Sequence, residues 1–183
     1  MDLADELERI ATVAAAYAEP GEEVAGILAA EPGSGVRVYL CAYQAADGRS
    51  WLALDEEGRP IDDRTAVRDA ASIAALCEVA AETAGGGELE ELRSRLVALR
   101  VRENPPGIDE AEEAALELEH AVGAAPRVAS PAYLDRVGAA TRRLEIALGD
   151  NVASPFAEAM KHAMGAVDDL TDEVERTYKR PLA

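Results

Sequence analysis

The sequence predicts an α+β protein that is predominantly α-helical, with one small antiparallel β-hairpin or three-stranded meander packed against helices. Three observations lead to this fold class. Apolar residues alternate on both sides of an Asp-Gly dipeptide in residues 36–54, a pattern typical of a hairpin. Elsewhere the apolar residues mostly recur every three or four positions, as on one face of a helix. Aromatic residues make up only 4% of the chain, which favours closely packed helices over a large β-sandwich.

Two short helices are predicted ahead of the hairpin. The first covers about residues 3–18, because its apolar residues repeat at alternating intervals of four and three. These residues are Leu3, Leu7, Ile10, Ala14 and Tyr17. The second is indicated by Val24, Ile27 and Leu28, whose spacing also suits one face of a helix. The Pro-Gly dipeptide at residues 32–33 is expected to end it.

The hairpin is predicted to turn at Asp47 and Gly48. A type I′ turn needs φ > 0 at both central positions, and Asp-Gly is a strong signal for it. A two-residue loop at this dipeptide places Tyr43 opposite Leu52. Both faces of the resulting ribbon are apolar, so helices are expected to cover both faces, at least in part.

A third strand and a long helix are expected to follow the hairpin. Gly58 suits the left-handed position of a second turn, and residues 59–61 then form a short strand. Pro60 confines that strand to the sheet edge, because proline cannot donate to the ladder. An aspartate at residues 62–63 begins the helix, and the triple glycine at residues 85–87 ends it.

The second half of the chain predicts an antiparallel helical bundle. A leucine stripe, Leu89, Leu92, Leu96 and Leu99, marks one more helix ahead of this bundle. The Asn-Pro-Pro-Gly sequence at residues 104–107 is the sharpest break. We therefore expect a single domain, residues 1–183, with two lobes, residues 1–103 and 104–183. Three more helices follow, two of them opened by Ser-Pro, and their narrow stripes are spaced for antiparallel packing.

Four arginines flank the leucine stripe: Arg93, Arg95, Arg100 and Arg102. Such a basic helix face suits a phosphate or carboxylate ligand. The alternative is a solvated face paired with neighbouring glutamates, which is common on exposed helices.

The chain is strongly acidic, with 36 acidic and 18 basic residues, a formal charge of −18 and a pI near 4.4. Such a surface repels nucleic acid and anionic lipid, so neither is an expected partner, and a charged partner is expected to be a basic protein. The first ten residues are acidic where a signal peptide needs positive charge, and a cytoplasmic protein is therefore expected. Cys41 and Cys77 lie on predicted buried faces and are expected to be small core residues.

Glu117 and His120 form the one metal-like pattern in the chain. Bundles that hold two metals between carboxylates use Glu-x-x-His on two helices. The second histidine, His162, has Glu158 four residues before it, which is the wrong spacing. Because the donor set is incomplete, we expect no metal and no cofactor. A carboxylate-bundle metalloenzyme built on these four residues is kept as an alternative.

Three aromatic residues of the hairpin, Tyr39, Tyr43 and Trp51, have polar tips that suit a pocket for a small apolar ligand. A ligand-binding module with its pocket between hairpin and helices is therefore a second alternative. Ordinary packing of these side chains in the sheet explains the same pattern.

No catalytic motif stands out, since nothing selects a pair among the 36 carboxylates. The expected function is that of a non-enzymatic interaction or assembly protein that self-associates through its helices as a homodimer. Leu170, Val174 and Tyr178 are the expected interface, because the stripe of the last helix is long enough to extend past its predicted neighbour.

Overall fold

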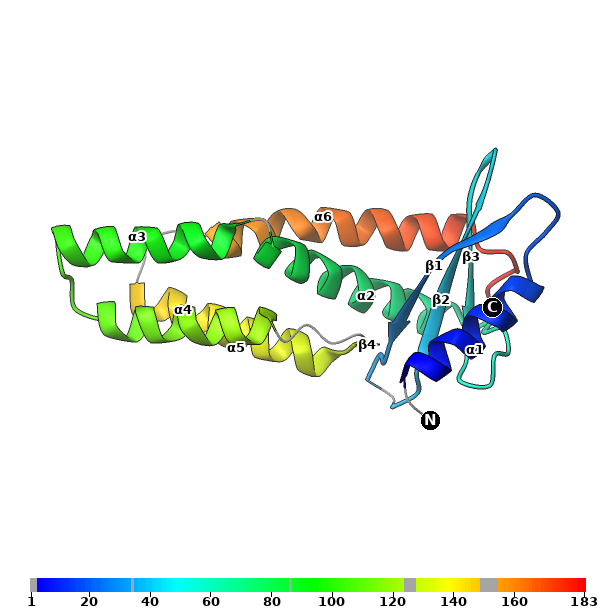
Figure 1. Cartoon of the computed structure of the whole chain (residues 1–183), viewed down its shortest axis with the longest axis horizontal. Coiled ribbons are helices and arrows are strands. Elements are labelled where there is room, and N and C mark those ends of the chain that lie inside the picture. Colours follow the sequence, from blue (N-terminus) through cyan, green and yellow to red (C-terminus); the bar gives the residue numbers. More distant parts are fainter. Residues whose placement is uncertain (1–2, 34, 86, 124–127, 149–154) are drawn as a thin grey trace. The chain divides into compact units, whose positions relative to one another are not determined.

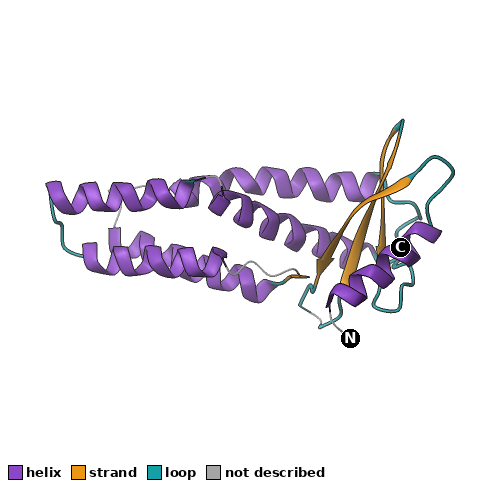
Figure 2. Ribbon diagram, viewed as in Figure 1, coloured by secondary structure: helices purple, strands orange, loops and turns teal. Residues whose placement is uncertain are grey.

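The computed structural model describes residues 3–33, 35–85, 87–123, 128–148 and 155–183. Within these ranges the chain is α+β and predominantly helical, which confirms the predicted fold class (Figures 1 and 2). The chain divides into two compact units. Unit 1 consists of residues 1–75, 127–131 and 167–183, and unit 2 of residues 76–126 and 132–166. The predicted boundary between residues 103 and 104 lies inside unit 2.

Unit 1 is built around a sheet with the strand order β3-β2-β1-β4. Its strands are β1 (Glu23–Ala30), β2 (Val38–Ala45), β3 (Gly48–Leu54) and β4 (Val128–Ala129). The first three strands in the chain pair antiparallel, whereas β4 pairs parallel with the end of β1. The antiparallel meander is therefore present, but the sheet as a whole is mixed.

The second predicted helix is wrong, because residues 23–30 form strand β1. Residues 23–30 pair with β2, and Ile27 and Ala29 lie opposite Cys41 and Tyr39. The apolar spacing of Val24, Ile27 and Leu28 misled because three residues in so short a segment fit a helix or a strand equally well. Pairing with β2 favours the strand, since it provides hydrogen-bond partners for the backbone and buries the end of the segment.

The hairpin forms where it was predicted, but its loop is one residue earlier. Ala46 and Asp47 make the turn, and Gly48 is already the first residue of β3, paired with Ala45. Tyr43 consequently lies opposite Ser50 rather than Leu52. The pairing differs from the predicted one by two residues, and side chains alternate with a period of two, so each keeps its predicted face.

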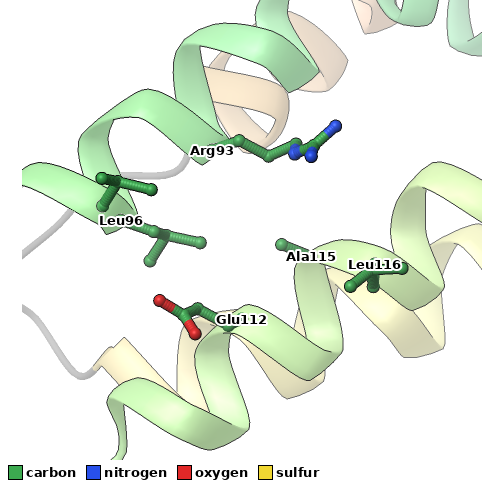
Figure 3. Close-up of a pocket in the computed structure, with 6 residues that line it drawn as sticks. Arg93, Leu96, Glu112, Ala115 and Leu116 are labelled. Atoms are coloured by element: carbon green, nitrogen blue, oxygen red, sulfur yellow. The ribbon is translucent and has the colours of Figure 1, made fainter. Parts of the chain in front are cut away.

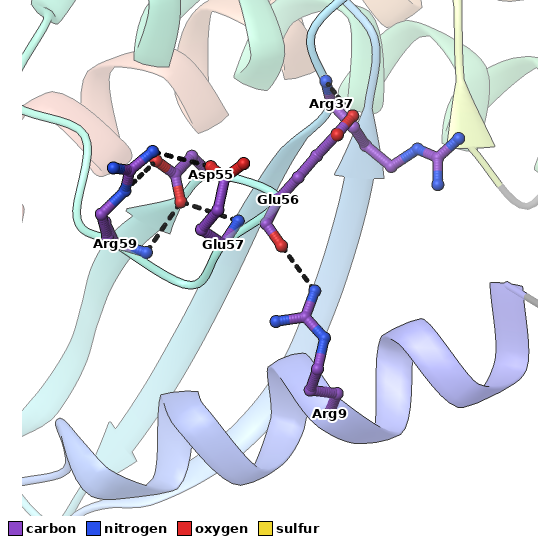
Figure 4. Close-up of polar contacts among 6 residues, drawn as sticks. All are labelled: Arg9, Arg37, Asp55, Glu56, Glu57 and Arg59. Carbon is purple, nitrogen blue, oxygen red and sulfur yellow. Dashed lines mark hydrogen bonds and ion pairs between the residues drawn. The ribbon is translucent and has the colours of Figure 1, made fainter. Parts of the chain in front are cut away.

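The expected third strand is reduced to a single bridge between Leu54 and Pro60. The turn before it is organised by Asp55 (Figure 4). The Asp55 carboxylate accepts hydrogen bonds from the N–H groups of Glu57 at 3.0 Å and Arg59 at 2.8 Å, and from the Arg59 guanidinium at 2.9 Å. Burial alone raises the pKa of Asp55, but the bonds from Arg59 outweigh it and lower the pKa below its ordinary value.

This turn is expected to contribute to stability above about pH 4 and to lose that contribution as the pH falls through the depressed folded-state pKa of Asp55. Asp55→Asn should therefore be less stable than the parent chain at pH 7 by about 1 kcal/mol. The difference should shrink as the pH falls through the depressed pKa of Asp55, because protonation removes the charge that Arg59 binds. Urea unfolding followed by tryptophan fluorescence over this pH range measures it.

The matched control is Glu57→Gln, which removes a more exposed carboxylate that also contacts Arg59. If the difference in unfolding free energy between Asp55→Asn and the parent chain stays constant with pH, the charge of Asp55 is not what stabilises the turn.

Helix α1 (Leu3–Ala16) covers one face of the sheet (Figure 1). Ile10 and Ala14 pack there in a cluster of buried side chains from β1, β2 and β3. Tyr43 Oη donates a hydrogen bond of 2.9 Å to the carbonyl of Ala14. The opposite face carries Leu40, Ala42, Trp51 and Ala53, all buried. The unit 1 parts of α2 (Arg64–Gly85) and α6 (Pro155–Arg176) lie on that side, so helices flank both faces as predicted.

A C-terminal segment, residues 177–179, extends the sheet beyond β3. Trp51 N–H donates to Thr177 O at 3.2 Å, and Lys179 N–H donates to Trp51 O at 2.9 Å, so the segment runs parallel to β3. Tyr178 Oη accepts from Ala53 N–H at 2.8 Å and donates to Ile61 O at 2.6 Å.

The Lys179 ammonium anchors this segment on the α1 face. It forms an ion pair with Glu22, donates to Tyr17 O at 3.0 Å and lies 3.7 Å from the centroid of the Tyr43 ring. The side chains of Lys179 and Glu22 are only 9% and 13% exposed. Because both charges are largely removed from water, each needs the other as its counterion.

Unit 2 contains α3 (Glu88–Arg102), α4 (Ile108–Gly123) and nearly all of α5 (Pro131–Leu148). Consecutive helices run antiparallel, as predicted for α4 and α5. Helix α3, which was expected in the first lobe, packs with them. At one end Tyr133 Oη donates to Val122 O at 3.4 Å, and at the other Gly107 lies against the carbonyl of Ala147. The buried side chains at the centre include Leu92, Leu96, Leu118 and Leu144.

Candidate functional site

Helices α3 and α4 pack as an antiparallel hairpin whose two helices carry opposite charge. From residue 93 onward α3 contains four arginines and no acidic residue, whereas α4 contains six acidic residues and neither arginine nor lysine. Buried Leu92 and Leu96 on α3, and Ala111, Ala115 and Leu118 on α4, hold the helices together. The hairpin therefore has a basic rim and an acidic rim.

Ion pairs join the two rims at two levels. Arg93 Nη1 lies 3.4 Å from Glu119 Oε2. Closer to the loop, Arg100 binds Glu112 through two hydrogen bonds of 2.8 Å and also contacts Asp109. The hydrogen bonds from Arg100 hold the pKa of Glu112 below its ordinary value, so its carboxylate is charged at neutral pH.

Between these two levels lies a groove of about 230 Å³ (Figure 3). Leu96 and Ala115 form its floor and are 2% and 3% exposed. Arg93 borders it from α3, and Glu112 and Leu116 from α4. The groove is therefore apolar in the middle and charged at both ends.

The apolar side chains at this groove are unusually open to solvent. Val97 is 59% exposed and Leu116 is 53% exposed, and both line the groove. Val101 is 79% exposed and follows Val97 by four residues, which places it on the same face of α3. We call Val97, Val101 and Leu116 the apolar strip. Exposed apolar groups of this kind, bordered by charge, are typical of a contact surface.

The predicted ligand site at Tyr39, Tyr43 and Trp51 is not gathered at one cavity. Tyr39 and Tyr43 face α1, while Trp51 lies on the opposite face of the sheet, and all three are at most 3% exposed. Trp51 Nε1 donates to Glu173 at 3.1 Å. Tyr39 Oη has charged neighbours in Glu6 and Arg37 but no hydrogen bond to either; burial, together with Glu6, raises the pKa of Tyr39 to about 12. These side chains belong to the core.

The weakly indicated metal ligands are only partly described. Glu117 and His120 both border a shallow depression of about 410 Å³ between α4 and α5, where Arg143 forms an ion pair with Glu117. The side chains of Glu158 and His162 lie outside the described residues. Within the described part of the chain, no three histidine, cysteine or acidic side chains gather in a way that holds a metal ion. The absence of a metal stays a prediction.

The predicted interface residues are largely used in packing within unit 1. Val174 is completely buried, Leu170 is half-buried, and the hydroxyl of Tyr178 is bonded to Ala53 and Ile61. After the helix the chain turns back and residues 177–179 pair with β3, so Tyr178 lies at the edge of the sheet. Any contact with a partner is better sought on α3 and α4.

The apolar strip is not part of the residue stripes that form the core, so those stripes did not predict it. The signal was present in the apolar residues left over from those stripes: Val97 and Val101 fall outside the leucine stripe of α3, and Leu116 falls outside the alanine-rich stripe of α4. A second apolar pair at helical spacing on an otherwise charged helix indicates a second contact face.

Across the described residues, every helix is too short or too polar to span a bilayer. In comparisons with known proteins, no family model, no curated protein and no solved structure matches this chain.

Proposed function

We propose that this chain is a non-enzymatic interaction protein that self-associates, and that the α3–α4 groove is its contact surface. The observation that carries the proposal is the apolar strip, exposed between a basic and an acidic rim. Full burial of a valine or leucine side chain is worth about 1.5–3 kcal/mol. Covering three partly exposed side chains therefore provides a substantial driving force for association.

The net charge of −18 opposes self-association. This repulsion acts over long distances and is screened beyond about 8 Å at physiological salt. Contacts at the groove act at shorter range. A dimer is the simplest assembly, because two-fold dimers are the commonest closed assemblies of identical chains.

Leu116→Glu is expected to convert a dimer into a monomer, because it places a charge in the middle of the apolar strip. Light scattering at about 0.15 M salt, over a range of protein concentrations, measures the change. The affinity should fall roughly a hundredfold, which corresponds to the lost burial of one leucine together with the cost of desolvating a carboxylate.

The matched control is Ile146→Glu on α5, which places the same charge at another exposed apolar residue, 76% exposed, that does not border the groove. This variant should associate like the parent chain. A parent chain that is monomeric at about 100 μM, or a loss of association that is equal in both variants, would refute the proposal; that concentration is far above the dissociation constant of a typical specific dimer.

A further inference from the structure

We infer that the occupant of the groove is the same hairpin of a second copy, with α3 of one chain lying on α4 of the other around a two-fold axis parallel to the helices. This inference rests on the proposed function and specifies its geometry. The basis is the distribution of charge along the groove, which distinguishes between the ways in which two identical hairpins can meet face to face.

The groove face of the hairpin is arranged in three layers along the helix axes. Arg93 and Glu119 form a charged layer at one end. Val97 and Leu116 form the apolar layer in the middle. Arg100, Glu112 and Asp109 form a second charged layer towards the loop. In each charged layer the arginine is on α3 and the carboxylates are on α4.

A two-fold axis parallel to the helices places each layer on the same layer of the second copy and exchanges the two helices. Arg93 then faces Glu119 of the second copy, Val97 faces Leu116, and Arg100 faces Glu112. Each α3 has an α4 as its neighbour both within the chain and across the interface, and all neighbours run antiparallel. The four helices thus alternate basic and acidic around the assembly, as favourable electrostatics requires.

The other simple arrangement has its two-fold axis in the interface but perpendicular to the helices. It places α3 on α3 and α4 on α4, and it superposes the first charged layer on the second. Arg93 then faces Arg100 of the second copy, and Glu119 faces Glu112. Like charges that meet in a desolvated interface cost several kcal/mol, so this arrangement is disfavoured.

Two charge-reversal variants test the arrangement. Arg93→Glu alone gives a homodimer with four carboxylates in one layer, and Glu119→Arg alone gives one with four arginines. Each variant should self-associate at least about tenfold more weakly than the parent. When the two are mixed in equal amounts, a heterodimer places residue 93 of each chain opposite residue 119 of the other, and both of these pairs then have opposite charges. The mixture should form a heterodimer almost exclusively, as read by native mass spectrometry with one chain isotope-labelled.

The control is Arg95→Glu, which makes the same charge change on α3. Arg95 lies two residues after Arg93, about 200° around the helix, and pairs with Glu91 outside the groove. It should neither weaken self-association nor direct heterodimer formation. Because the Arg93–Glu119 pair is exposed, the reversals should leave the circular dichroism spectrum unchanged.

A cross-linking experiment on the native charges provides an independent test. Val97→Cys and Leu116→Cys, made in separate chains and mixed under oxidation, should form a disulfide between different chains. Neither variant alone should do so, because the two copies of one position lie on helices that are not adjacent in the inferred arrangement and are too far apart for a disulfide. Cys41 and Cys77 are buried and do not compete.

The outcomes separate the two proposals. A disulfide of Val97→Cys with itself, or a mixture of charge variants without heterodimer preference, would overturn the inferred arrangement even if Leu116→Glu abolishes association. A monomeric parent chain would overturn the proposed function and this inference together. A heterodimer, with cross-links only in the mixture, would support both.

Discussion

Replacing Lys179 with methionine is expected to lower the free energy of unfolding of unit 1 by about 3 kcal/mol, because it leaves a largely buried carboxylate without its counterion. Methionine keeps most of the apolar stem of the lysine and removes only the ammonium. Glu22, 13% exposed, then loses its ion pair. The bond to Tyr17 O and the contact with the Tyr43 ring are lost with it.

The pKa of Glu22 also indicates that its carboxylate is stabilised by Lys179. Burial alone raises its pKa, but the hydrogen bonds from Lys179, the Glu19 N–H and Ser50 outweigh burial and hold the pKa below its ordinary value. Without Lys179 the largest contribution that opposes burial disappears, and the pKa of Glu22 should rise.

Urea unfolding followed by Trp51 fluorescence measures this prediction selectively, since Trp51 is the only tryptophan of the chain and is buried in unit 1. Arg180→Met is the matched control, because it removes an exposed cation from the next position and should change the stability by less than about 0.5 kcal/mol. Adding Glu22→Gln to Lys179→Met should recover part of the loss. Equal effects of Lys179→Met and Arg180→Met would show that the ion pair does not stabilise the unit.

Gly107→Ala is expected to destabilise unit 2 by about 3 kcal/mol, from two separate causes. Gly107 has φ +89°, a conformation that residues with a side chain rarely adopt. In addition, a Cβ atom at this position would lie 2.7 Å from the carbonyl oxygen of Ala147. Relief of that overlap requires the end of α5 to move away from the loop between α3 and α4.

Gly87→Ala separates these two causes, since Gly87 has φ +91° but has nothing within 4 Å of the position of a Cβ atom. It should cost only the backbone strain, about 1–2 kcal/mol. Thermal unfolding followed by the helical circular dichroism signal compares the two variants. If both lower the melting temperature by the same amount, the contact with Ala147 contributes nothing.

The faces of the hairpin could be predicted from sequence more reliably than its pairing. Alternation alone assigns Tyr39, Cys41 and Tyr43 to one face, and this assignment survives the shift of the loop. The exact pairing depends on which two residues turn the chain, and the structure uses Ala46 and Asp47 rather than Asp47 and Gly48. Strand β1 was not predictable in the same way, because its identity depends on pairing with β2 rather than on its own pattern.

The helices of unit 2 were predicted because their core stripes stand between clear breaks in the sequence, at residues 85–87, 104–107 and 130–131. The groove was not predicted, because it depends on which sides of α3 and α4 meet. Arg93 and Arg100 show the difference: the sequence left open whether they bind a ligand or neighbouring glutamates. The structure pairs them with Glu119 and Glu112 of the neighbouring helix α4, which follow them in the chain by 26 and 12 residues.

The ion pair between Lys179 and Glu22 also has a consequence for biosynthesis, because 157 residues separate the two partners in the chain. At about 5–20 residues per second, a ribosome needs roughly 8–30 s to make the intervening chain. Throughout that interval Glu22 lacks its counterion, and the outer edge of β3 lacks its last neighbour. Folding of unit 1 should therefore reach completion only after translation has passed the lysine, even though its first three strands emerge early.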